Sequence, residues 1–453
     1  MIPVALSAQQ QEVYDLVEST RQHVFITGRA GTGKSTLLSH LSQVTAKQIA
    51  VCAPTGVAAL NVGGQTIHSL FRLPIGLIGT SDLNHGPDQR KILKAIDTLV
   101  IDEISMVNAD VMDAIDRALR ESRQRKKEPF GGVQVIMFGD PYQLAPVPPR
   151  SLEEKSYLAD RYASHWFFDA AVWKSTELRT IELTEIHRQR DDDFKAMLNA
   201  VRHGVVTPEI GAALNAAGNR PAPEEGIITL ATTNARVNAI NAARLEKLEG
   251  KTLTAEAEVS GEFGANMFPA EEALALKVGA QVMFLRNDSD QRWVNGTIGH
   301  VTRIADTVFV DIAGTEVEVH PATWERYKYT YSQANDELKR DVVAEFTQFP
   351  LRLAWAVTIH KSQGQTYERA LIDMGARAFA PGQTYVALSR ITTLDGLYLS
   401  RGLRPSDIIV DPDVERFMAP IDDPNADPTA APFVQPDVAP GLEPSREPPQ
   451  IIP

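Results

Sequence analysis

Residues 23–44 read HVFITGRAGTGKSTLLSHLSQV, an apolar run followed by a glycine-rich turn and a stretch with helical periodicity. Residues 28–35 match the pattern GxxxxGK(S/T), in which main-chain N–H groups and a helix N-terminus surround a polyphosphate. Three glycines let the main chain approach the phosphates: Gly28, Gly31 and Gly33. Lys34 would neutralise the phosphate oxygens, and Ser35 can ligate magnesium. The stretch therefore predicts a strand, a phosphate loop and a helix that bind a nucleoside triphosphate.

A second acidic motif, DTLVIDEISMV at residues 97–107, places an apolar strand before two carboxylates. Asp102 would hold magnesium directly or through water, and Glu103 would polarise the attacking water. Alternatively, the two carboxylates only cap the next helix. The phosphate loop upstream favours the catalytic interpretation, so the sequence predicts hydrolysis of the nucleotide.

Composition sets the broad class of protein. At 453 residues, with 43% hydrophobic and 23% charged residues, the chain predicts two to three globular domains. Neither an 18-residue apolar run nor a cationic signal pattern is visible, which predicts a soluble, cytoplasmic protein without membrane contact, nucleoid-associated if bacterial. The single Cys52 excludes disulfides and cysteine-ligated clusters and is expected to face a core.

The C-terminal segment differs from the rest of the chain. Residues 411–453 carry a net charge of −7, and the other residues account for −6 of the total of −13. Global charge therefore neither supports nor excludes a nucleic-acid partner, which a local basic groove can still bind. Proline recurs at every fourth position from Pro420 to Pro448, which predicts an acidic, disordered tail over 406–453. The tail is either a solvated terminus or a docking peptide for a protein partner.

Apolar strand candidates alternate with helical stretches, which predicts an α/β fold with parallel sheets. The first set is HVFITG, QIAVCAP, TLVIDE and VQVIMFGD, and the second is GIITLATT, LRLAWAVT, ALIDMG and GLYLSR, with a helix over 234–249. We expect a first domain over 1–176, and a second over 177–275 and 347–405. Residues 72–92 are a candidate wedge insert, and short alternating strands predict a small β-barrel insert over 276–346.

Eight stretches occur in an order that resembles superfamily-one helicases of the Pif-one family, with RecD-type enzymes as near relatives. They are GRAGTGKST, APTGVAALNVGGQTIHSLF, LVIDEISMV, FGGVQVIMFGDPYQLAPV, RVNAIN, WVNGTIGHV, TIHKSQGQT and YVALSR. The resemblance covers nearly everything from Leu6 to Arg401. It implies two RecA-like P-loop NTPase domains that use ATP and Mg²⁺, and single-stranded and forked duplex DNA as partners.

The resemblance also implies roles at the nucleotide. Gln10 would read adenine through its amide, with Gln9 as the adjacent alternative, although Ser7 and Gln10 also fit a helix-capping box. Gln143 would sense the γ-phosphate. Further nucleotide contacts are expected at Thr32, Thr36 and Gly364. Pro141 stands where family members have an aromatic residue.

Two arginines are expected to reach the transferring phosphoryl group across the cleft between the domains. Arg188 and Arg390 resemble family arginines of this kind, and a guanidinium fork suits the charge spread over phosphoryl oxygens. His187, directly before Arg188, replaces the phenylalanine usual in the family. The alternative for either arginine is a surface salt bridge.

Six residues resemble family contacts to single-stranded phosphates and sugars: Thr55, Gly56, His68, Thr358, His360 and Lys361. Hydroxyl, imidazole and main-chain donors bind a nucleic-acid backbone without reading its sequence. The basic stretch Arg117–Lys127 is instead expected to be a solvated helix end. Trp293 and Trp324 are either core residues or stacking platforms.

Together these expectations describe an ATP-dependent DNA helicase that moves 5′ to 3′ on single-stranded DNA, in replication, repair or recombination. The direction follows from the family resemblance and from no residue's chemistry. Two alternatives stay open: an ATP-dependent remodeller of RNA or ribonucleoprotein, and a nucleic-acid-binding module with weak ATPase activity.

Overall fold

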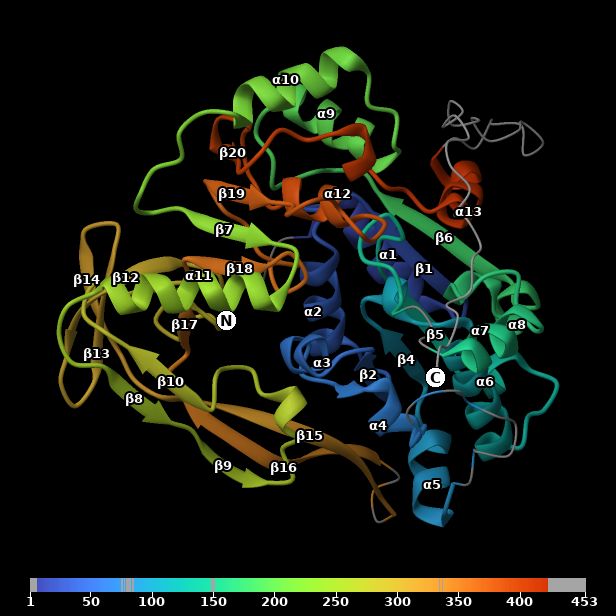
Figure 1. Cartoon of the computed structure of the whole chain (residues 1–453). Helices are drawn as coiled ribbons and strands as arrows, with labels where there is room; N and C mark the ends of the chain where they lie inside the picture. The colour runs from blue at the N-terminus through green and yellow to red at the C-terminus, as the bar shows by residue number, and fades with distance from the viewer. Residues whose placement is uncertain are drawn as a thin grey trace, which may run out of the picture.

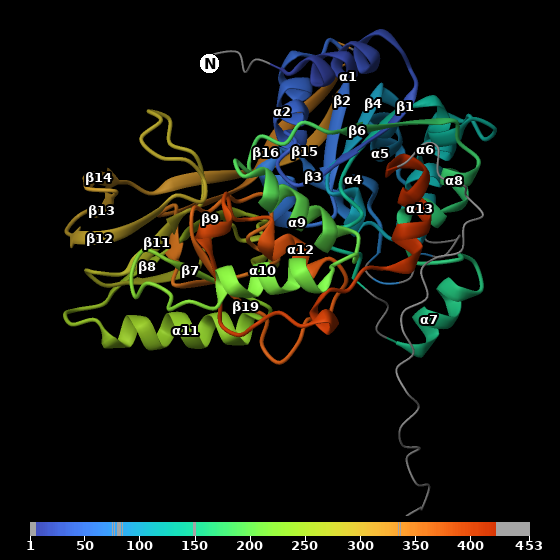
Figure 2. The same cartoon turned by 90° about the horizontal axis from the view of Figure 1, so that it is seen from above.

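A computed structural model describes residues 6–422 except 75, 77, 79–82, 84, 148–150, 334 and 336. Two parallel sheets with their helices lie next to each other, and antiparallel strands extend away from them (Figures 1 and 2). This is the α/β architecture that the sequence predicts.

The first sheet has six parallel strands in the order β3-β2-β4-β5-β1-β6. The strands are β1 (His23–Gly28), β2 (Ile49–Ala53), β3 (Gln65–Thr66), β4 (Thr98–Ile101), β5 (Gln134–Phe138) and β6 (Leu178–Leu183). The four apolar runs of the first predicted set form β1, β2, β4 and β5.

Alternate residues of these strands enter two cores, because successive side chains of a strand point to opposite faces. Val24 and Ile26 pack with α1 (Ala8–Ser19) and α2 (Lys34–Val44) on one face. Phe25 packs on the other face, where Cys52 is also buried, as predicted. The remaining helices of this part are α3 (Gly56–Asn61), α4 (Ile67–Phe71), α5 (Pro87–Ala95), α6 (Ala109–Arg123), α7 (Leu152–Ala159) and α8 (Ala171–Lys174).

The second sheet has four parallel strands in the order β18-β7-β19-β20. Its elements are β7 (Ile228–Ala231), β18 (Ala356–Thr358), β19 (Ala370–Asp373), β20 (Leu397–Leu399), α9 (Asp192–Arg202), α10 (Pro208–Gly218), α11 (Asn234–Lys247) and α12 (Gln383–Leu388). The helix predicted over 234–249 is α11. Short 3-10 helices complete the chain: Ile104–Met106, Pro129–Gly132, Phe167–Asp169, Ala265–Met267, Leu394–Gly396 and Pro405–Asp407.

The antiparallel strands form three sheets. A five-stranded sheet has the order β14-β13-β12-β11-β17, a three-stranded sheet the order β15-β16-β9, and β8 pairs with β10. The strands are β8 (Leu253–Glu256), β9 (Glu258–Gly261), β10 (Ala273–Leu276), β11 (Gln281–Phe284), β12 (Ile298–Ile304), β13 (Val308–Ile312), β14 (Thr315–Val319), β15 (Ala322–Ser332), β16 (Glu337–Gln348) and β17 (Leu351–Leu353).

The barrel predicted over 276–346 is not seen, because β14 and β17 are open edges of the five-stranded sheet in the described part of the chain. The hairpin β15-β16 instead reaches the first sheet, where the Tyr329 hydroxyl accepts a hydrogen bond from the Val51 amide at 2.8 Å. The run LRLAWAVT, predicted as one strand, forms two strands: β17 belongs to the five-stranded antiparallel sheet and β18 to the second parallel sheet.

The domain boundary predicted at residue 176 is also wrong. Strand β6 pairs with β1 over six residues, so the first sheet continues to Leu183. The apolar pattern of β6 is weak, with only Leu183 buried, and pairing with a distant strand rather than local hydrophobicity makes it a strand.

The predicted start of the disordered tail at residue 406 is too early. Helix α13 (Pro412–Asp422) follows β20 and buries Val414 and Met418. Pro412 fits the start of a helix, and the apolar face compensates for the hydrogen bond that Pro420 cannot donate. The rest of the predicted tail, 423–453, lies outside the described residues.

The candidate wedge insert over 72–92 lies partly outside the described residues. Its described part packs on the first domain, since Ile78 is buried and His85 Nε2 lies 2.8 Å from the Phe71 carbonyl oxygen. A wedge role stays a prediction.

In the described part of the chain, no helix combines the length and the apolarity that crossing a bilayer requires.

Candidate active site

The phosphate loop connects β1 to α2 in a left-handed, tightly packed conformation. Gly31 and Gly33 have φ values of 86° and 81°, which side chains other than hydrogen disfavour. A Cβ at Gly31 would lie 2.5 Å from Cβ of Arg188, and one at Gly33 would meet the Gln10 amide. The loop therefore requires glycine at these positions both for its conformation and for its contacts.

Lys34 begins α2, and its side chain is held over the loop. Its Nζ donates to the carbonyl oxygens of Gly28 at 2.5 Å and Arg29 at 3.1 Å. Burial lowers the pKa of Lys34, and the nearby carboxylates of Asp140 and Glu103 act in the opposite direction. A half-buried ammonium at the N-terminus of a helix suits an anionic ligand, which would replace the carbonyl contacts with stronger charged ones.

Asp102 and Glu103 follow β4 directly, as predicted, and lie near Lys34. Burial raises the pKa of both carboxyl groups, and the charge of Asp102 raises that of Glu103 further. A cation beside them would favour their charged forms. The described residues contain no group of three or more His, Cys, Asp or Glu side chains that forms a cage for a metal. The oxygen donors of Ser35 and Asp102 fit Mg²⁺, which binds proteins through one or two oxygen ligands and keeps water and phosphate as the others.

One cavity of about 830 Å³ collects nearly all the predicted nucleotide residues. From the predicted set it is lined by Gln10, Gly31, Thr32, Gly33, Lys34, Ser35, Thr36, Asp102, Glu103, Gln143, Arg188, Gly364 and Arg390. Gly28 does not line it and contributes through the loop conformation. Sequence reasoning missed three further lining residues, Arg190, Thr366 and Thr392. Thr366 ends the stretch TIHKSQGQT, whereas Arg190 and Thr392 lie outside the quoted motifs.

Gln10 serves as a helix cap and also faces the cavity. The Gln10 Oε1 accepts a hydrogen bond from the main-chain amide of Ser7 at 2.9 Å, and the main-chain amide of Gln10 donates one to Ser7 Oγ at 3.3 Å. Together these bonds form the capping box of α1. Gln10 Nε2 donates to the Gly33 carbonyl at 3.2 Å. The capping interpretation is thus confirmed, and adenine recognition stays a prediction. Gln9 instead bonds the main chain of β6 and the next residue, at Glu182 O and Thr184 N.

The two predicted arginines lie together at the cavity. The Arg188 guanidinium donates to Ser389 O at 3.2 Å and Gly364 O at 3.4 Å. Arg390 is 1% exposed and donates to Val386 O at 2.9 Å. Burial and then the charge of Arg390 lower the pKa of Arg188 to about 9. A polyanion in the cavity would relieve this repulsion. Arg390 is buried and Arg188 half-buried at the cavity wall, so among the described residues neither takes part in a surface salt bridge.

A chain of amides connects the carboxylate Glu103 to the second sheet. Gln143 Nε2 donates to Asp140 Oδ2 at 3.1 Å. Gln363 Nε2 lies 3.1 Å from Glu103 Oε2 and 3.4 Å from Gln143 Oε1. Gln363 is part of the stretch TIHKSQGQT, yet no feature of that stretch distinguishes it from its neighbours.

A second cavity of about 350 Å³ lies between the two parallel sheets and the antiparallel strands. Of the six predicted nucleic-acid residues, Thr55, His360 and Lys361 line it, and Gly56, His68 and Thr358 do not. Thr358 Oγ1 accepts from the Lys361 amide at 3.2 Å, and Thr55 Oγ1 caps α3, so both shape the cavity wall. His68 lies in α4, where burial lowers its pKa.

The structure separates the two tryptophans. Trp293 stacks on Phe284 with ring centroids 4.4 Å apart and is a core residue. Trp324 lines the second cavity, with the Arg286 guanidinium 5.8 Å from its ring centroid. Sequence reasoning also missed Arg352, a cation in the wall of this cavity.

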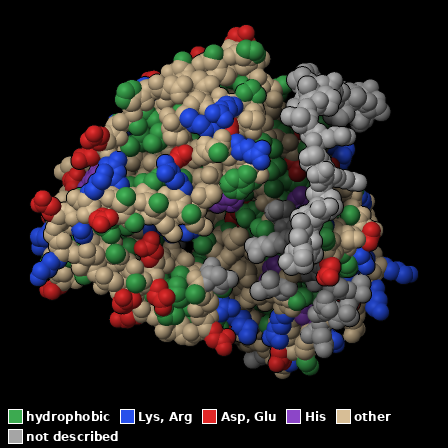
Figure 3. Space-filling model, in the orientation of Figure 1, with side chains coloured by type: hydrophobic (Ala, Val, Ile, Leu, Met, Phe, Trp, Pro, Cys, Tyr) green, Lys and Arg blue, Asp and Glu red, His purple; other side chains and the backbone are tan. Residues whose placement is uncertain are grey.

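The basic stretch at residues 117–127 covers the end of α6 and the residues after it, and the predicted solvated character holds for the exposed residues 125–127 but not for the half-buried arginines within the helix. Arg120 pairs with Asp116 at 2.7 Å, and Arg123 donates to the carbonyl oxygens of Lys94, Ile96 and Gly131. Acidic and basic side chains are interspersed on the face seen in Figure 3, which displays no broad basic patch. Any polyanion on this face must therefore be held locally.

Comparisons with known proteins agree with this geometry. The sequence model of the family "PIF1-like helicase" matches residues 5–210, and that of "DNA helicase Pif1, 2B domain" matches residues 263–304. The ATP-dependent DNA helicase Pif1 of Bdellovibrio bacteriovorus is 35% identical over 427 residues, which cover 91% of this chain and 92% of the relative. Human PIF1 is 37% identical, and the match covers 88% of this chain but 61% of that protein.

The solved structures of Bacteroides sp Pif1 are similar over 93% of this chain and 98% of theirs. The form in complex with ADP-AlF4 has 37% identity and a TM-score of 0.86, and the form bound to ssDNA has 38% identity and a TM-score of 0.67. By sequence and by structure, the chain belongs to the PIF1-like helicase family.

Proposed function

We propose that this chain is an ATP-dependent DNA helicase that uses Mg²⁺ and moves 5′ to 3′ on single-stranded DNA. One observation carries the proposal: Glu103 lines both the 830 Å³ cavity and the 350 Å³ cavity. Because Glu103 lies at the site of hydrolysis and also faces the second cavity, a ligand bound in one cavity can affect binding or turnover in the other.

In this proposal, the phosphate loop and Lys34 bind the triphosphate, and Ser35 and Asp102 hold the magnesium, which would neutralise phosphate charge. Glu103 accepts a proton from the attacking water. Arg188 and Arg390 stabilise the charge on the transferred group, so that nucleotide draws the second sheet toward the first. Alternating grip by the two parts then moves the chain along the strand.

The nucleic-acid partner is proposed as single-stranded and forked duplex DNA. Bacteroides Pif1, a structural relative, has been solved bound to ssDNA and at forked dsDNA. The second cavity offers hydroxyl, imidazole and ammonium groups with an indole ring, which suit a single strand's phosphates and bases. None of these groups distinguishes deoxyribose from ribose by its chemistry, so the sugar must be tested.

Unwinding of labelled forks tests the function and the direction together. We expect the wild type to unwind duplexes that carry a 5′ single-stranded tail, with ATP, and to leave those with only a 3′ tail paired. Equal ATPase stimulation by RNA and by single-stranded DNA would favour the RNA remodeller, and ATP turnover without unwinding would favour the binding module. Preference for a 3′ tail would contradict the proposed direction.

The tail after Asp422 is expected to weaken DNA binding at low salt. Residues 423–453 contain five acids and one arginine, a net charge of −4, and compete with phosphates for the same cations. The Debye length falls to ~10 Å at 0.1 M salt, which screens this competition. Removing 423–453 should therefore tighten single-strand binding more at low than at high salt, as measured by fluorescence anisotropy.

The control is a full-length chain whose five tail acids are changed to amides, which should match the truncated chain. Basal ATPase should not change, because the predicted motifs lie upstream. A cut after Val410, by contrast, would remove α13 and its buried side chains. Equal affinities of full-length and truncated chains at both salt concentrations would leave the tail as a passive terminus or a peptide for a protein partner.

A further inference from the structure

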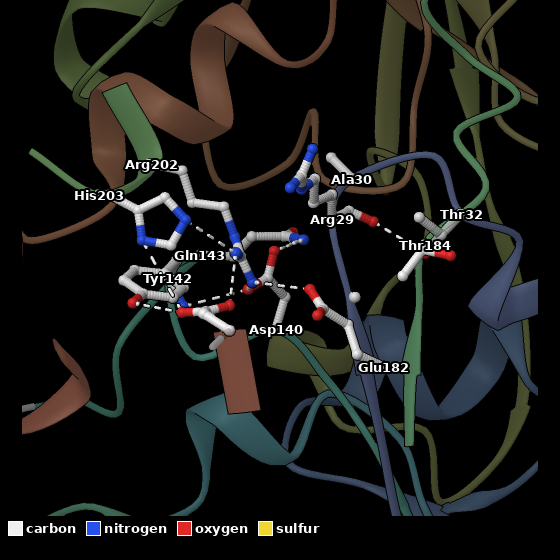
Figure 4. Close-up of polar contacts among 12 residues, drawn as sticks. Arg29, Ala30, Thr32, Asp140, Tyr142, Gln143, Glu182, Thr184, Arg202 and His203 are labelled. Atoms are coloured by element: carbon white, nitrogen blue, oxygen red, sulfur yellow. Dashed lines mark hydrogen bonds and ion pairs between the residues drawn. The ribbon is translucent and has the colours of Figure 1, made fainter. Parts of the chain in front are cut away.

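One buried arginine next to the nucleotide cavity is surrounded by carboxylates from separate elements. Arg202 ends α9, and its side chain has no exposed area. Its guanidinium lies 3.3 Å from Asp140 Oδ1, 3.3 Å from Asp422 Oδ1 and 4.0 Å from Glu182 Oε1. Figure 4 shows Arg202 pointing between Asp140 and Glu182. Because arginine keeps its proton, this charge is fixed inside the protein.

Asp140 connects Arg202 to the nucleotide cavity. Its Oδ1 accepts from the Tyr142 amide at 3.2 Å as well as from Arg202, and its Oδ2 accepts from Gln143 Nε2 at 3.1 Å. Gln143 lines the cavity, and Gln363 joins it to Glu103. Lys34 is within electrostatic range of both Asp140 and Arg202. Without Arg202, the Asp140 carboxylate would be drawn toward Lys34 and would take the Gln143 amide with it.

Asp422 connects the same arginine to the C-terminal helix. Its Oδ2 accepts from the Tyr142 hydroxyl at 3.0 Å, and the Arg202 guanidinium lies 4.3 Å from the centre of the Tyr142 ring. Asp422 is the last residue of α13, so the position of its carboxylate depends on how that helix is docked.

Helix α13 crosses from the second sheet to the first domain. Before it, the Ile409 carbonyl accepts from the Gly382 amide at the start of α12. Within it, Phe417 stacks on Phe168 with ring centroids 4.2 Å apart and contacts Trp173 of α8 at 5.7 Å. Trp166 Nε1 donates to Asp411 Oδ2 at 3.0 Å. The segment that contains α13 therefore contacts both domains, and the last residue of the helix, Asp422, pairs with Arg202.

We propose that Arg202 is a positioning residue for ATP hydrolysis: it fixes the position of Asp140 and, through Asp140, that of Gln143. Because Asp422 also binds Arg202, the position of Arg202 depends on the docking of α13. The inference rests on the proposed roles of Gln143 and Glu103. A purely structural ion pair would affect folding stability, whereas a positioning residue affects turnover in molecules that remain folded.

The test compares variants of the full chain in steady-state ATPase assays with and without single-stranded DNA. Arg202→Gln should lower kcat by about 10- to 100-fold, the range for removed supporting contacts at a site, and leave KM for ATP within about twofold. Arg202→Lys, which retains the charge, should recover part of kcat. Asp422→Asn, at a partly exposed carboxylate, should lower kcat by about three- to tenfold.

Asp413→Asn is the matched control, since Asp413 lies in the first turn of the same helix and pairs with Arg416, not with Arg202. Thermal unfolding identifies the temperatures at which each variant is folded. Wild-type kcat in folded Asp422→Asn, or an equal loss in Asp413→Asn, would overturn the inference, even if Arg202→Gln does not fold. If the wild type itself does not hydrolyse ATP, the proposed function fails, and this inference fails with it.

Discussion

Replacing Lys34 with alanine is expected to lower kcat for DNA-stimulated ATP hydrolysis by at least ~10²- to 10³-fold, the usual effect of losing one charge-stabilising donor. Lys34 Nζ is the ammonium held over the phosphate loop, where it donates to Gly28 O and Arg29 O. Its loss removes a positive charge from the cavity without emptying a core. Phosphate release under saturating ATP and single-stranded DNA measures the effect.

Glu103→Gln should separate binding from chemistry. The amide keeps the size of the side chain but cannot accept the proton of water, so kcat should fall by ~10²- to 10⁴-fold. Binding of a fluorescent ATP analogue with Mg²⁺ should persist in this variant and weaken in Lys34→Ala, because only the latter loses a cation of the phosphate site.

Lys47→Ala is the control for these variants, since Lys47 also donates to main-chain carbonyls, those of Val17 and Thr20, away from the cavity. We expect it to unfold at a lower temperature but to keep its turnover while folded. Turnover like that of the wild type in either Lys34→Ala or Glu103→Gln would show that the 830 Å³ cavity is not the site of hydrolysis.

Loss of Arg390 is expected to have the largest effect outside the phosphate loop. An arginine that stabilises the transferring phosphoryl group contributes ~10³- to 10⁵-fold to turnover. Arg390 is fully buried beside Arg188, and no carboxylate of the described residues lies within salt-bridge distance of either guanidinium. Arg390→Ala should therefore lower kcat by that range, with KM for ATP changed far less, in steady-state ATPase assays with single-stranded DNA.

Arg188→Ala should give a loss of the same kind, because its guanidinium shares the cavity and contacts Ser389 O of the same motif as Arg390. Arg390→Lys should recover little, since a single ammonium cannot reproduce the planar fork. Arg244→Ala, at an exposed position of α11, controls for the loss of one positive charge. A twofold change in kcat corresponds to only ~0.4 kcal/mol of transition-state stabilisation. If kcat of folded Arg390→Ala remains within twofold of wild type, the arginine has no part in the chemistry.

Local sequence determined the elements and the nucleotide site. The phosphate loop requires its glycines and Lys34 at a fixed spacing within eight residues, so the motif itself places them where β1 passes into α2. Asp102 and Glu103 end a buried strand, and the carboxyl ends of parallel strands meet at one edge of a sheet. The strands of the two predicted parallel sets were recognisable because buried parallel strands are continuous apolar runs.

Tertiary structure decided what depends on partners distant in the sequence. Strand β6 belongs to the first sheet because it pairs with β1, and LRLAWAVT is divided because two different sheets recruit its halves. Helix α13 is ordered because a first-domain aromatic cluster covers its apolar face. The sequence could not connect Arg202 to Asp140 and Asp422, 62 and 220 residues away, because a buried ion pair has no local pattern and exists only after the chain has folded.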